Sequence, residues 1–290
     1  MLFGALEAGG TKMVCAIGDE QGTIFSREVF PTQTPEITIP LMLQYFKKYK
    51  LDALGIGCFG PLDLNRNSAT YGSITTTPKL PFKNYNIVNA FKDELKIPVG
   101  FDTDVNCSVL GESHFGALRG LSSGIYLTIG TGIGAGILIN QKPVHGILHP
   151  EAGHILLQRN EADSFEGCCP YHKNCFEGLA SGPAIEKRYG RKAYELKDQV
   201  EVWELEAEYI AKALINYILV LAPEKIILGG GVMHQEQLFP LIRKKTLALL
   251  NGYIDTKEIK NIDQYIIPPS LDDNQGILGC IKLAMMELEV

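Results

Sequence analysis

Two histidines and two cysteines near the middle of the chain have the types and spacing of a metal site. The pattern is Cys-x-x-His-x-x-Cys with a further histidine upstream, and its residues are His154, Cys169, His172 and Cys175. Thiolates and imidazoles are the usual ligands of structural zinc, and four of them leave no open position for chemistry. We therefore expect a zinc ion that orders this loop. Unliganded core thiols are the alternative, and Cys168 could compete for one ligand position.

Glycine-rich turns are a second feature that could do chemistry. Glycine makes up 30 of the 290 residues, and the excess gathers at 9–10, 130–136 and 229–231. Without a Cβ, backbone N–H groups can approach phosphate oxygens closely. Hydroxyl and ammonium donors adjoin the first two turns, whose residues are Gly9, Gly10, Thr11, Lys12, Thr131 and Gly132. These turns predict a phosphate cradle without a Walker A loop, and two ordinary hairpin turns are the alternative.

Two further glycine segments bear on nucleotide binding. The cluster formed by Gly229, Gly230 and Gly231 follows an apolar strand and precedes a helix, where a backbone can pass close to a base and ribose. Residues 55–60 match G-x-G-x-x-G, but Pro61 follows and the next dozen residues cannot start the helix that a dinucleotide site needs. A nicotinamide cofactor is therefore disfavoured.

Asp104 is the candidate general base. It lies between a predicted strand at 99–102 and a predicted helix at 105–118. Phosphoryl transfer to a hydroxyl needs a base within hydrogen-bond reach of the attacking oxygen, and a carboxylate at the carboxyl end of a strand is well placed for this. The alternative is that Asp104 only caps the helix.

The elements that position these residues alternate along the chain as two copies of one α/β unit. Strands are predicted at 2–6, 12–18, 23–30, 54–59, 99–102, 125–129, 135–140, 225–228 and 265–267. Helices are predicted at 35–50, 87–96, 105–118 and 201–221, and from about 235 and 274 onward. The first of these is expected to begin with Thr34 as a capping hydroxyl and Pro35 at the first helical position. Each copy opens with a strand pair joined by a Gly/Thr turn, which favours a nucleotide held between two lobes.

Composition excludes several classes of protein. A chain of 290 residues, with 46% hydrophobic and 21% charged residues, is typical of a soluble globular protein of about two domains. Its 27 basic and 33 acidic residues give a net charge of −6, with no basic stripe for nucleic acid. The uncharged stretch 120–141 holds six glycines and reads as two strands and a turn, so no membrane partner is expected.

The compartment is expected to be the cytoplasm. The first residues show no basic region, apolar region or cleavage site of a secretory signal. Seven cysteines, an odd number, fit reduced thiols better than a disulfide framework.

Several of these segments together resemble the ROK family of sugar kinases. They are residues 7–12, 60–63, 102–106, 128–132, 151–154 and the Cys/His loop, and residues 71–79 look like the fructokinase branch. The resemblance implies an actin-like, ribonuclease H-type α/β fold with an interlobe cleft and a homodimer. It further implies transfer of the γ-phosphate of ATP to the 6-hydroxyl of D-fructose, with Mg²⁺. The lobes would be 1–118 plus 274–290, and 119–273 with the zinc-binding loop.

The resemblance also implies roles for individual residues. Asp104 would take the proton from the sugar hydroxyl, and the three glycine turns would contact the phosphates and the adenosine of ATP. Sugar hydroxyls would be held by Glu151, His154 and Glu177, with His154 also binding zinc. Two positions depart from the family pattern: Glu7 replaces an aspartate that contacts magnesium through water, and Thr103 replaces the asparagine of glucose-specific relatives.

Two other functions remain open at this point. One is a broader hexokinase acting on mannose, glucose or N-acetylated sugars. The other is a sugar-responsive regulator without catalysis, which would carry a DNA-binding module before the first turn. Because that turn begins at Gly9 and the charge balance is acidic, we expect no such module and disfavour this function.

Overall fold

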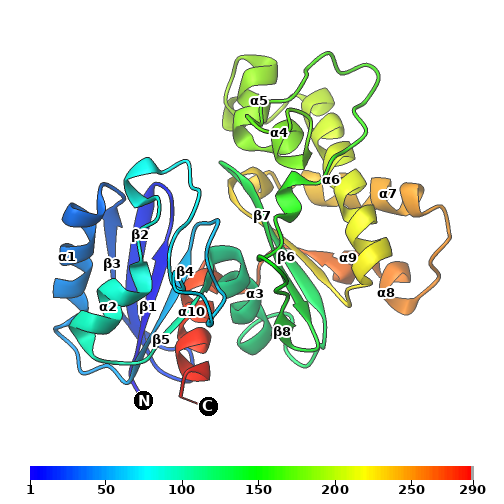
Figure 1. The fold of residues 1–290 in the computed structure, drawn as a ribbon. Coiled ribbons are helices and arrows are strands. Elements are labelled where there is room, and N and C mark those ends of the chain that lie inside the picture. Colours follow the sequence, from blue (N-terminus) through cyan, green and yellow to red (C-terminus); the bar gives the residue numbers. More distant parts are fainter. Residues whose placement is uncertain (289–290) are drawn as a thin grey trace. The chain divides into compact units, whose positions relative to one another are not determined.

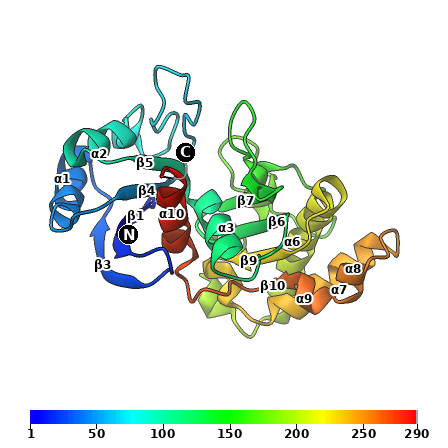
Figure 2. The same ribbon diagram turned by 90° about the horizontal axis from the view of Figure 1, so that it is seen from below.

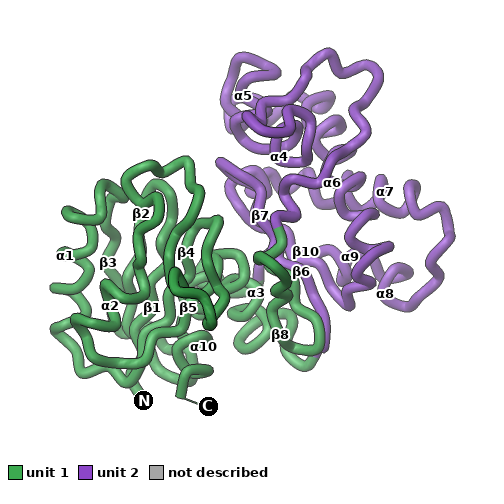
Figure 3. The backbone as a smooth tube through the Cα atoms, viewed as in Figure 1, with its two compact units in different colours: residues 1–120, 136–150, 270–290 green, residues 121–135, 151–269 purple. Residues whose placement is uncertain are grey.

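The computed structural model describes residues 1–288, which form two compact units. Unit 1 comprises Met1–Gly120, Gly136–Pro150 and Ser270–Val290, and unit 2 comprises Leu121–Ala135 and Glu151–Pro269 (Figure 3). Each unit is described by itself below. No helix among the described residues is long and apolar enough to cross a membrane.

A five-stranded mixed sheet forms the centre of unit 1, in the order β3-β2-β1-β4-β5 (Figure 1). The pair β1 and β2 is antiparallel, as is the pair β2 and β3, whereas β1, β4 and β5 run parallel. All six residues of β4 are buried, as expected for a central strand with helices on both faces. The strands are β1 (Phe3–Ala8), β2 (Lys12–Gly18), β3 (Ile24–Pro31), β4 (Ala53–Cys58) and β5 (Val99–Thr103).

Helices cover both faces of this sheet, and Figure 2 shows the two layers on either side of the strands. One layer contains α1 (Pro35–Phe46) and α2 (Ile87–Leu95), whose Phe46 and Phe91 rings pack edge to face at 6.0 Å. The other contains α3 (Asp104–His114) and the C-terminal helix α10 (Gln275–Met286). A short 3-10 turn, η1 (Leu80–Phe82), lies between β4 and α2 in the sequence.

Glycines let the backbones of α3 and α10 approach each other closely. A Cβ placed on Gly279 of α10 would lie 1.6 Å from the carbonyl oxygen of Cys107 in α3. A Cβ on Gly111 of α3 would lie 2.2 Å from the carbonyl oxygen of Gln275. Because a real side chain cannot occupy either position, these contacts fix α3, and with it the residue that begins the helix.

A second five-stranded sheet has the order β10-β9-β6-β7-β8. Its strands are β6 (Gly124–Ile129), β7 (Ile133–Ile139), β8 (Lys142–Pro143), β9 (Ile226–Gly229) and β10 (Ile266–Ile267). Reversed, this is β8-β7-β6-β9-β10, which matches the first sheet strand for strand in chain order. The strands β6, β9 and β10 are parallel, like β1, β4 and β5. The predicted duplication of one α/β unit is therefore confirmed.

The helices from α4 to α9 belong to unit 2. The long helix α6 packs against α7 and α4 (Figure 1). The α-helices are α4 (Phe176–Ala180), α5 (Gly182–Tyr189), α6 (Val200–Leu221), α7 (Leu238–Leu250), α8 (Lys257–Lys260) and α9 (Ile262–Tyr265). The 3-10 turns are η2 (Ala152–His154), η3 (Ala193–Leu196) and η4 (Gly231–His234).

Several predicted boundaries are wrong. The helix predicted to end at 118 ends at His114, since the Ala117 N–H donates to the Glu112 carboxylate at 2.9 Å and turns the chain away. The first helix ends at Phe46 rather than 50. Thr34 does not cap it with its side chain, because the hydroxyl is hydrogen-bonded to the Glu36 carboxylate. The helix expected from about 235 begins at Leu238, after the η4 turn.

The close approach of α3 and α10 predicts the effect of adding one methyl group. Gly279→Ala forces a Cβ against the Cys107 carbonyl, so the free energy of unfolding should fall by at least about 2 kcal/mol. Urea denaturation measures this change. Gly146→Ala is the matched control, because a Cβ there meets only one atom, at 3.8 Å, and should leave stability unchanged. Equal stability of the two variants would contradict the packing described here.

Candidate active site

The first glycine turn joins β1 to β2 and is shaped by its own backbone. The Gly9 N–H donates to the Lys12 carbonyl at 3.0 Å, and a Cβ on Gly9 would lie 2.7 Å from that oxygen. The Thr32 hydroxyl donates to the Gly9 carbonyl at 2.7 Å and anchors the turn. The side chains of Thr11 and Lys12 are exposed. The tight turn thus requires glycine at position 9 and presents two polar side chains to solvent.

Glu7 lies on β1, just before this turn. Burial raises the pKa of its carboxyl group, while the charges of Arg27 and Lys12 oppose that shift. A Cβ on Gly276 would lie 2.8 Å from the carboxyl carbon, so the glycine lets the Glu7 carboxylate pack against the first turn of α10. A half-buried carboxylate has the chemistry of a hard-cation ligand, held directly or through water.

Asp104 is the first residue of α3, and the alternative that it caps the helix is wrong. The cap is Thr103, whose Oγ1 accepts a hydrogen bond from the Asn106 N–H at 3.1 Å. Asp104 is half-buried, and its Oδ1 accepts from the Val105 N–H at 2.9 Å. The positive end of the helix stabilises a carboxylate at this position. Asp104 therefore lies at the N-terminal end of α3, where the helix dipole contributes positive charge.

Strand register brings the first turn and Asp104 to one edge of the sheet. Ala8 at the end of β1 pairs with Cys58 of β4, and Cys58 pairs with Thr103 of β5. The turn after Ala8 and the carboxylate after Thr103 are therefore separated by a single strand, or about 10 Å.

Asp102 is the centre of a hydrogen-bond network that the sequence analysis missed. Its Oδ1 accepts from the Thr103 N–H and from Asn106 Nδ2, each at 2.7 Å, and its Oδ2 lies 2.9 Å from His145 Nε2. This bond to Asp102 raises the pKa of His145. The buried carboxylate thus holds the strand end, the first turn of α3 and His145 together. The predicted strand end at 102 and helix start at 105 bracket part of this network, but nothing in the sequence signalled His145.

The second glycine turn, in unit 2, is tied to Glu177. Glu177 Oε2 accepts from the Ile133 N–H at 2.9 Å, and a Cβ on Gly132 would lie 2.8 Å from the same oxygen. The Gly182 N–H donates to the Gly130 carbonyl at 2.8 Å. Thr131 is exposed at the tip. Glu177, predicted only as a sugar ligand, therefore also orders the second turn.

The third glycine cluster lies beside the second turn. Gly229 pairs with Thr128 at the ends of β9 and β6, and a Cβ on Gly130 would lie 3.6 Å from the Gly231 nitrogen. Gly230 has a φ of 90°, and its Cβ would meet the Ile129 backbone at 2.5 Å. Position 230 requires glycine, and unit 2 holds both turns at one sheet edge.

The four predicted metal ligands are brought together in unit 2. The ligand atoms of His154, Cys169, His172 and Cys175 all lie within 4.8 Å of one another. His154 Nδ1 is 3.5 Å from Cys175 Sγ and 3.7 Å from Cys169 Sγ, which is 3.7 Å from His172 Nδ1. Ligands at about 2.0–2.3 Å from a tetrahedral ion lie about 3.6 Å apart. The donor set and its spacing thus fit a zinc ion.

The backbone of the loop explains how this cluster is held. Cys169 and Lys173 exchange backbone hydrogen bonds of 3.4 and 3.0 Å in a tight turn. A Cβ on Gly178 would lie 1.8 Å from the Lys173 carbonyl oxygen, so this glycine lets α4 close against the turn. Cys168 is not one of the four clustered residues, and its N–H donates to the Gly178 carbonyl at 2.9 Å.

Glu151 precedes His154 in unit 2. Partial desolvation and the like charge of Glu177 raise the pKa of its carboxyl group. Thus unit 2 holds the second and third turns, Glu151, Glu177 and the Cys/His cluster, whereas unit 1 holds the first turn, Thr103 and Asp104.

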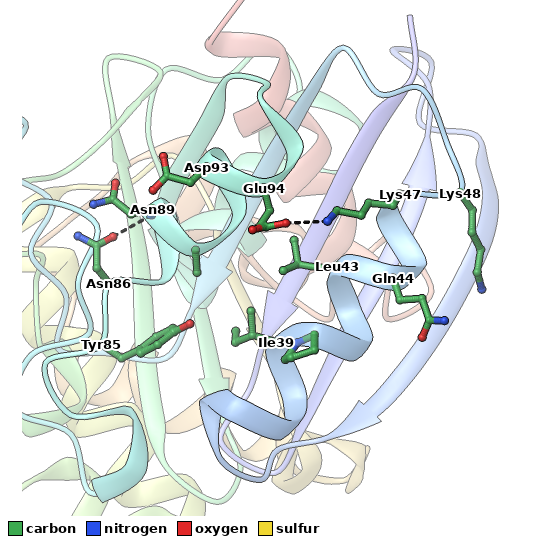
Figure 4. A pocket seen from close by; sticks show the side chains of 12 residues that line it. Ile39, Leu43, Gln44, Lys47, Lys48, Tyr85, Asn86, Asn89, Asp93 and Glu94 are labelled. Carbon is green, nitrogen blue, oxygen red and sulfur yellow. Dashed lines mark hydrogen bonds and ion pairs between the residues drawn. The ribbon is translucent and has the colours of Figure 1, made fainter.

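A surface groove in unit 1 is separate from these residues. It runs between α1 and α2, as Figure 4 shows, and the Lys47–Glu94 ion pair of 2.6 Å crosses it. None of the predicted site residues lines it.

Known proteins resemble the chain over its whole length. A model of the ROK family matches residues 3–287. A Bacillus subtilis (strain 168) protein named "Putative fructokinase" is 53% identical over 99% of this chain and 97% of its own length. A protein from Pediococcus pentosaceus named "Fructokinase" is 45% identical, over 100% of this chain and 99% of its own.

Solved structures agree with this assignment. A ROK hexokinase from Thermus thermophilus superposes with a TM-score of 0.83 at 25% identity, covering 100% of this chain and 99% of that one. A ROK family glucokinase from Streptomyces griseus superposes with a TM-score of 0.78 at 23% identity, covering 99% and 100%. The second likeness shows the fold alone. With a match from residue 3 to residue 287 and two sheets of one strand order, the chain belongs to the ROK family.

Proposed function

We propose that the chain is an ATP-dependent fructokinase, which transfers the γ-phosphate of ATP to the 6-hydroxyl of D-fructose and gives fructose 6-phosphate and ADP. The observation that carries this proposal is the position of the Asp104 carboxylate, at the same sheet edge as the first glycine turn. The names of relatives at 40–53% identity support fructose as the sugar.

Asp104 is the general base of this reaction. Its carboxylate accepts the proton of the 6-hydroxyl as that oxygen attacks the γ-phosphorus, and the bond from the γ-phosphorus to the bridging oxygen breaks with ADP leaving. General bases of this kind contribute about 10²–10⁴-fold to the rate. Asp104 begins α3, and the network around Asp102 fixes the position of that helix end.

The candidate fructose ligands are Thr103 in unit 1 and Glu151, His154 and Glu177 in unit 2. The Thr103 hydroxyl is buried and caps α3, so its contact with the sugar would use the hydroxyl proton. Glu177 offers a carboxylate fixed by the Ile133 N–H, and His154 offers an imidazole. The carboxyl group of Glu151 can hydrogen-bond to a sugar hydroxyl.

The candidate nucleotide contacts are the three glycine turns, one in unit 1 and two in unit 2. Gly9, Gly10, Thr11 and Lys12 contact phosphate in unit 1, and Thr131 and Gly132 do so in unit 2. Gly229, Gly230 and Gly231, beside the second turn, contact adenosine. Glu7, half-buried at the end of β1, would hold Mg²⁺ through water. Bound Mg²⁺ supplies positive charge that neutralises the phosphates.

The Cys/His cluster binds structural zinc. The fit of the four ligands supports this, and the ion would order the loop from which His154 reaches the sugar. We further propose that the protein is a cytoplasmic homodimer. The family resemblance supports this proposal, and the molecular mass measured by sedimentation tests the dimer.

Sugar specificity is tested by a coupled assay of ADP release. With ATP and Mg²⁺, kcat/KM should be highest for fructose among fructose, mannose, glucose and N-acetylglucosamine. A higher value for glucose would favour the broader hexokinase. If none of the four sugars gives ADP, the kinase proposal fails.

Removing the base separates chemistry from binding. Asp104→Asn should lower kcat by about 10²–10⁴-fold, because the amide cannot accept the proton, while the Kd for ATP and the Tm stay unchanged. Steady-state kinetics and calorimetry measure these quantities. Asp93→Asn, an exposed carboxylate of α2, is the control and should match the wild type. Near-normal turnover in the Asp104 variant would refute its assigned role.

Two adjacent thiols provide a matched test of the zinc site. Elemental analysis should find about one zinc per chain, retained in Cys168→Ser and lost in Cys169→Ser. A loss of about 2 kcal/mol on metal removal would lower Tm by about 4–8 °C. If the wild-type protein is metal-free, or its Tm is insensitive to chelators, it has no structural zinc.

A further inference from the structure

A lysine distant in sequence lies against the first glycine turn. A Cβ placed on Gly10 would be only 3.2 Å from Cε of Lys79, and apart from the adjoining residues 9 and 11 no other atom comes within 4 Å of it. The lysine side chain therefore packs across the face of the turn that glycine leaves bare. Its ammonium group is one bond beyond Cε. Both residues belong to unit 1.

The backbone around Lys79 is held in place by the core. The Lys79 N–H donates to the hydroxyl of buried Thr77 at 3.2 Å, and its carbonyl accepts from the Phe82 N–H at 2.8 Å. Phe82 is fully buried. Its ring packs edge to face against the rings of Phe59 and Tyr85, with centroid distances of 5.9 and 6.0 Å. The segment is therefore anchored on both sides of Lys79, which limits where its side chain can reach.

The charge of Lys79 is not neutralised by a carboxylate. Over residues 1–288 the ion pairs include lysines 47, 48, 173, 212, 245, 257 and 260, but not Lys79. Lys12, the lysine of the turn itself, acts electrostatically on Glu7. An exposed ammonium beside a bare glycine turn, with no carboxylate partner, is suited to an anionic ligand.

We propose that Lys79 is a catalytic residue that binds the γ-phosphate of ATP during transfer. This inference rests on the proposed kinase function. The first turn lies one strand away from Asp104, so the phosphate that meets Lys79 is close to the hydroxyl that Asp104 deprotonates. The bond from the sugar oxygen to phosphorus forms, the bond to the bridging oxygen breaks, and the proton goes to Asp104. Lys79 stays protonated and stabilises the charge on the phosphoryl oxygens.

The role of Lys79 can be separated from a structural one by comparing two nucleotides. Lys79→Ala should lower kcat by about 10²–10³-fold with the KM for fructose unchanged. By calorimetry, the Kd for the β,γ-imido analogue of ATP should rise about tenfold, since a charge-assisted hydrogen bond is lost, whereas the Kd for ADP should stay unchanged. Lys79→Arg keeps the charge and should recover much of the affinity for the analogue.

Lys83→Ala is the matched control, because it removes an exposed lysine four residues away and should change none of these quantities. An unchanged kcat in Lys79→Ala would overturn the proposal. So would an equal weakening of both nucleotides, because the γ-phosphate is what distinguishes them. If the wild-type protein phosphorylates no sugar, the kinase function fails, but the difference between the nucleotides still tests the contact with Lys79.

Discussion

The approach of α3 to α10, backbone against backbone, is the constraint on which the rest of unit 1 depends. At Gly279 and Gly111 a single Cβ would occupy the space of a carbonyl oxygen. The contact sets the depth and direction of α3, which begins with Asp104. The carboxylate of Asp102 then ties the strand end to Asn106 and His145, so the candidate base is fixed both along the helix and at its start.

The two sheets show how one topology can supply different chemistry. In both, a glycine turn joins the first two strands, and the next parallel strand ends at the same edge. In unit 1 the residues at that edge include Lys12, Lys79, Glu7 and Asp104. Two ammonium groups and two carboxylates suit binding of a phosphate and deprotonation of a hydroxyl. In unit 2 the edge carries Glu177 and the glycines at 229–231. Cys175 of the Cys/His cluster caps the start of α4. The duplicated frame positions the turns, and the residues added to each copy decide what the turns bind.

Much of this could be predicted from the sequence, because the signals are local. Alternating strands and helices gave the duplicated α/β unit, and the Cys-x-x-His-x-x-Cys spacing gave the cluster that the structure brings together. Helix ends were less predictable, because they depend on tertiary contacts such as that of Glu112 with Ala117. Thr103 rather than Asp104 is the cap, a choice between neighbours that spacing cannot make. His145 and Lys79 reach their partners across 43 and 69 residues of sequence, for which there is no local signal.

The central claim is that the residues at this sheet edge transfer a phosphoryl group to one hydroxyl of fructose. It is tested most directly by carbon NMR of the sugar product formed from ATP and fructose. The account predicts phosphorus coupling at C6, with one ADP formed for each phosphorylated sugar. Phosphorus coupling at C1, or ADP accompanied only by inorganic phosphate, would contradict it.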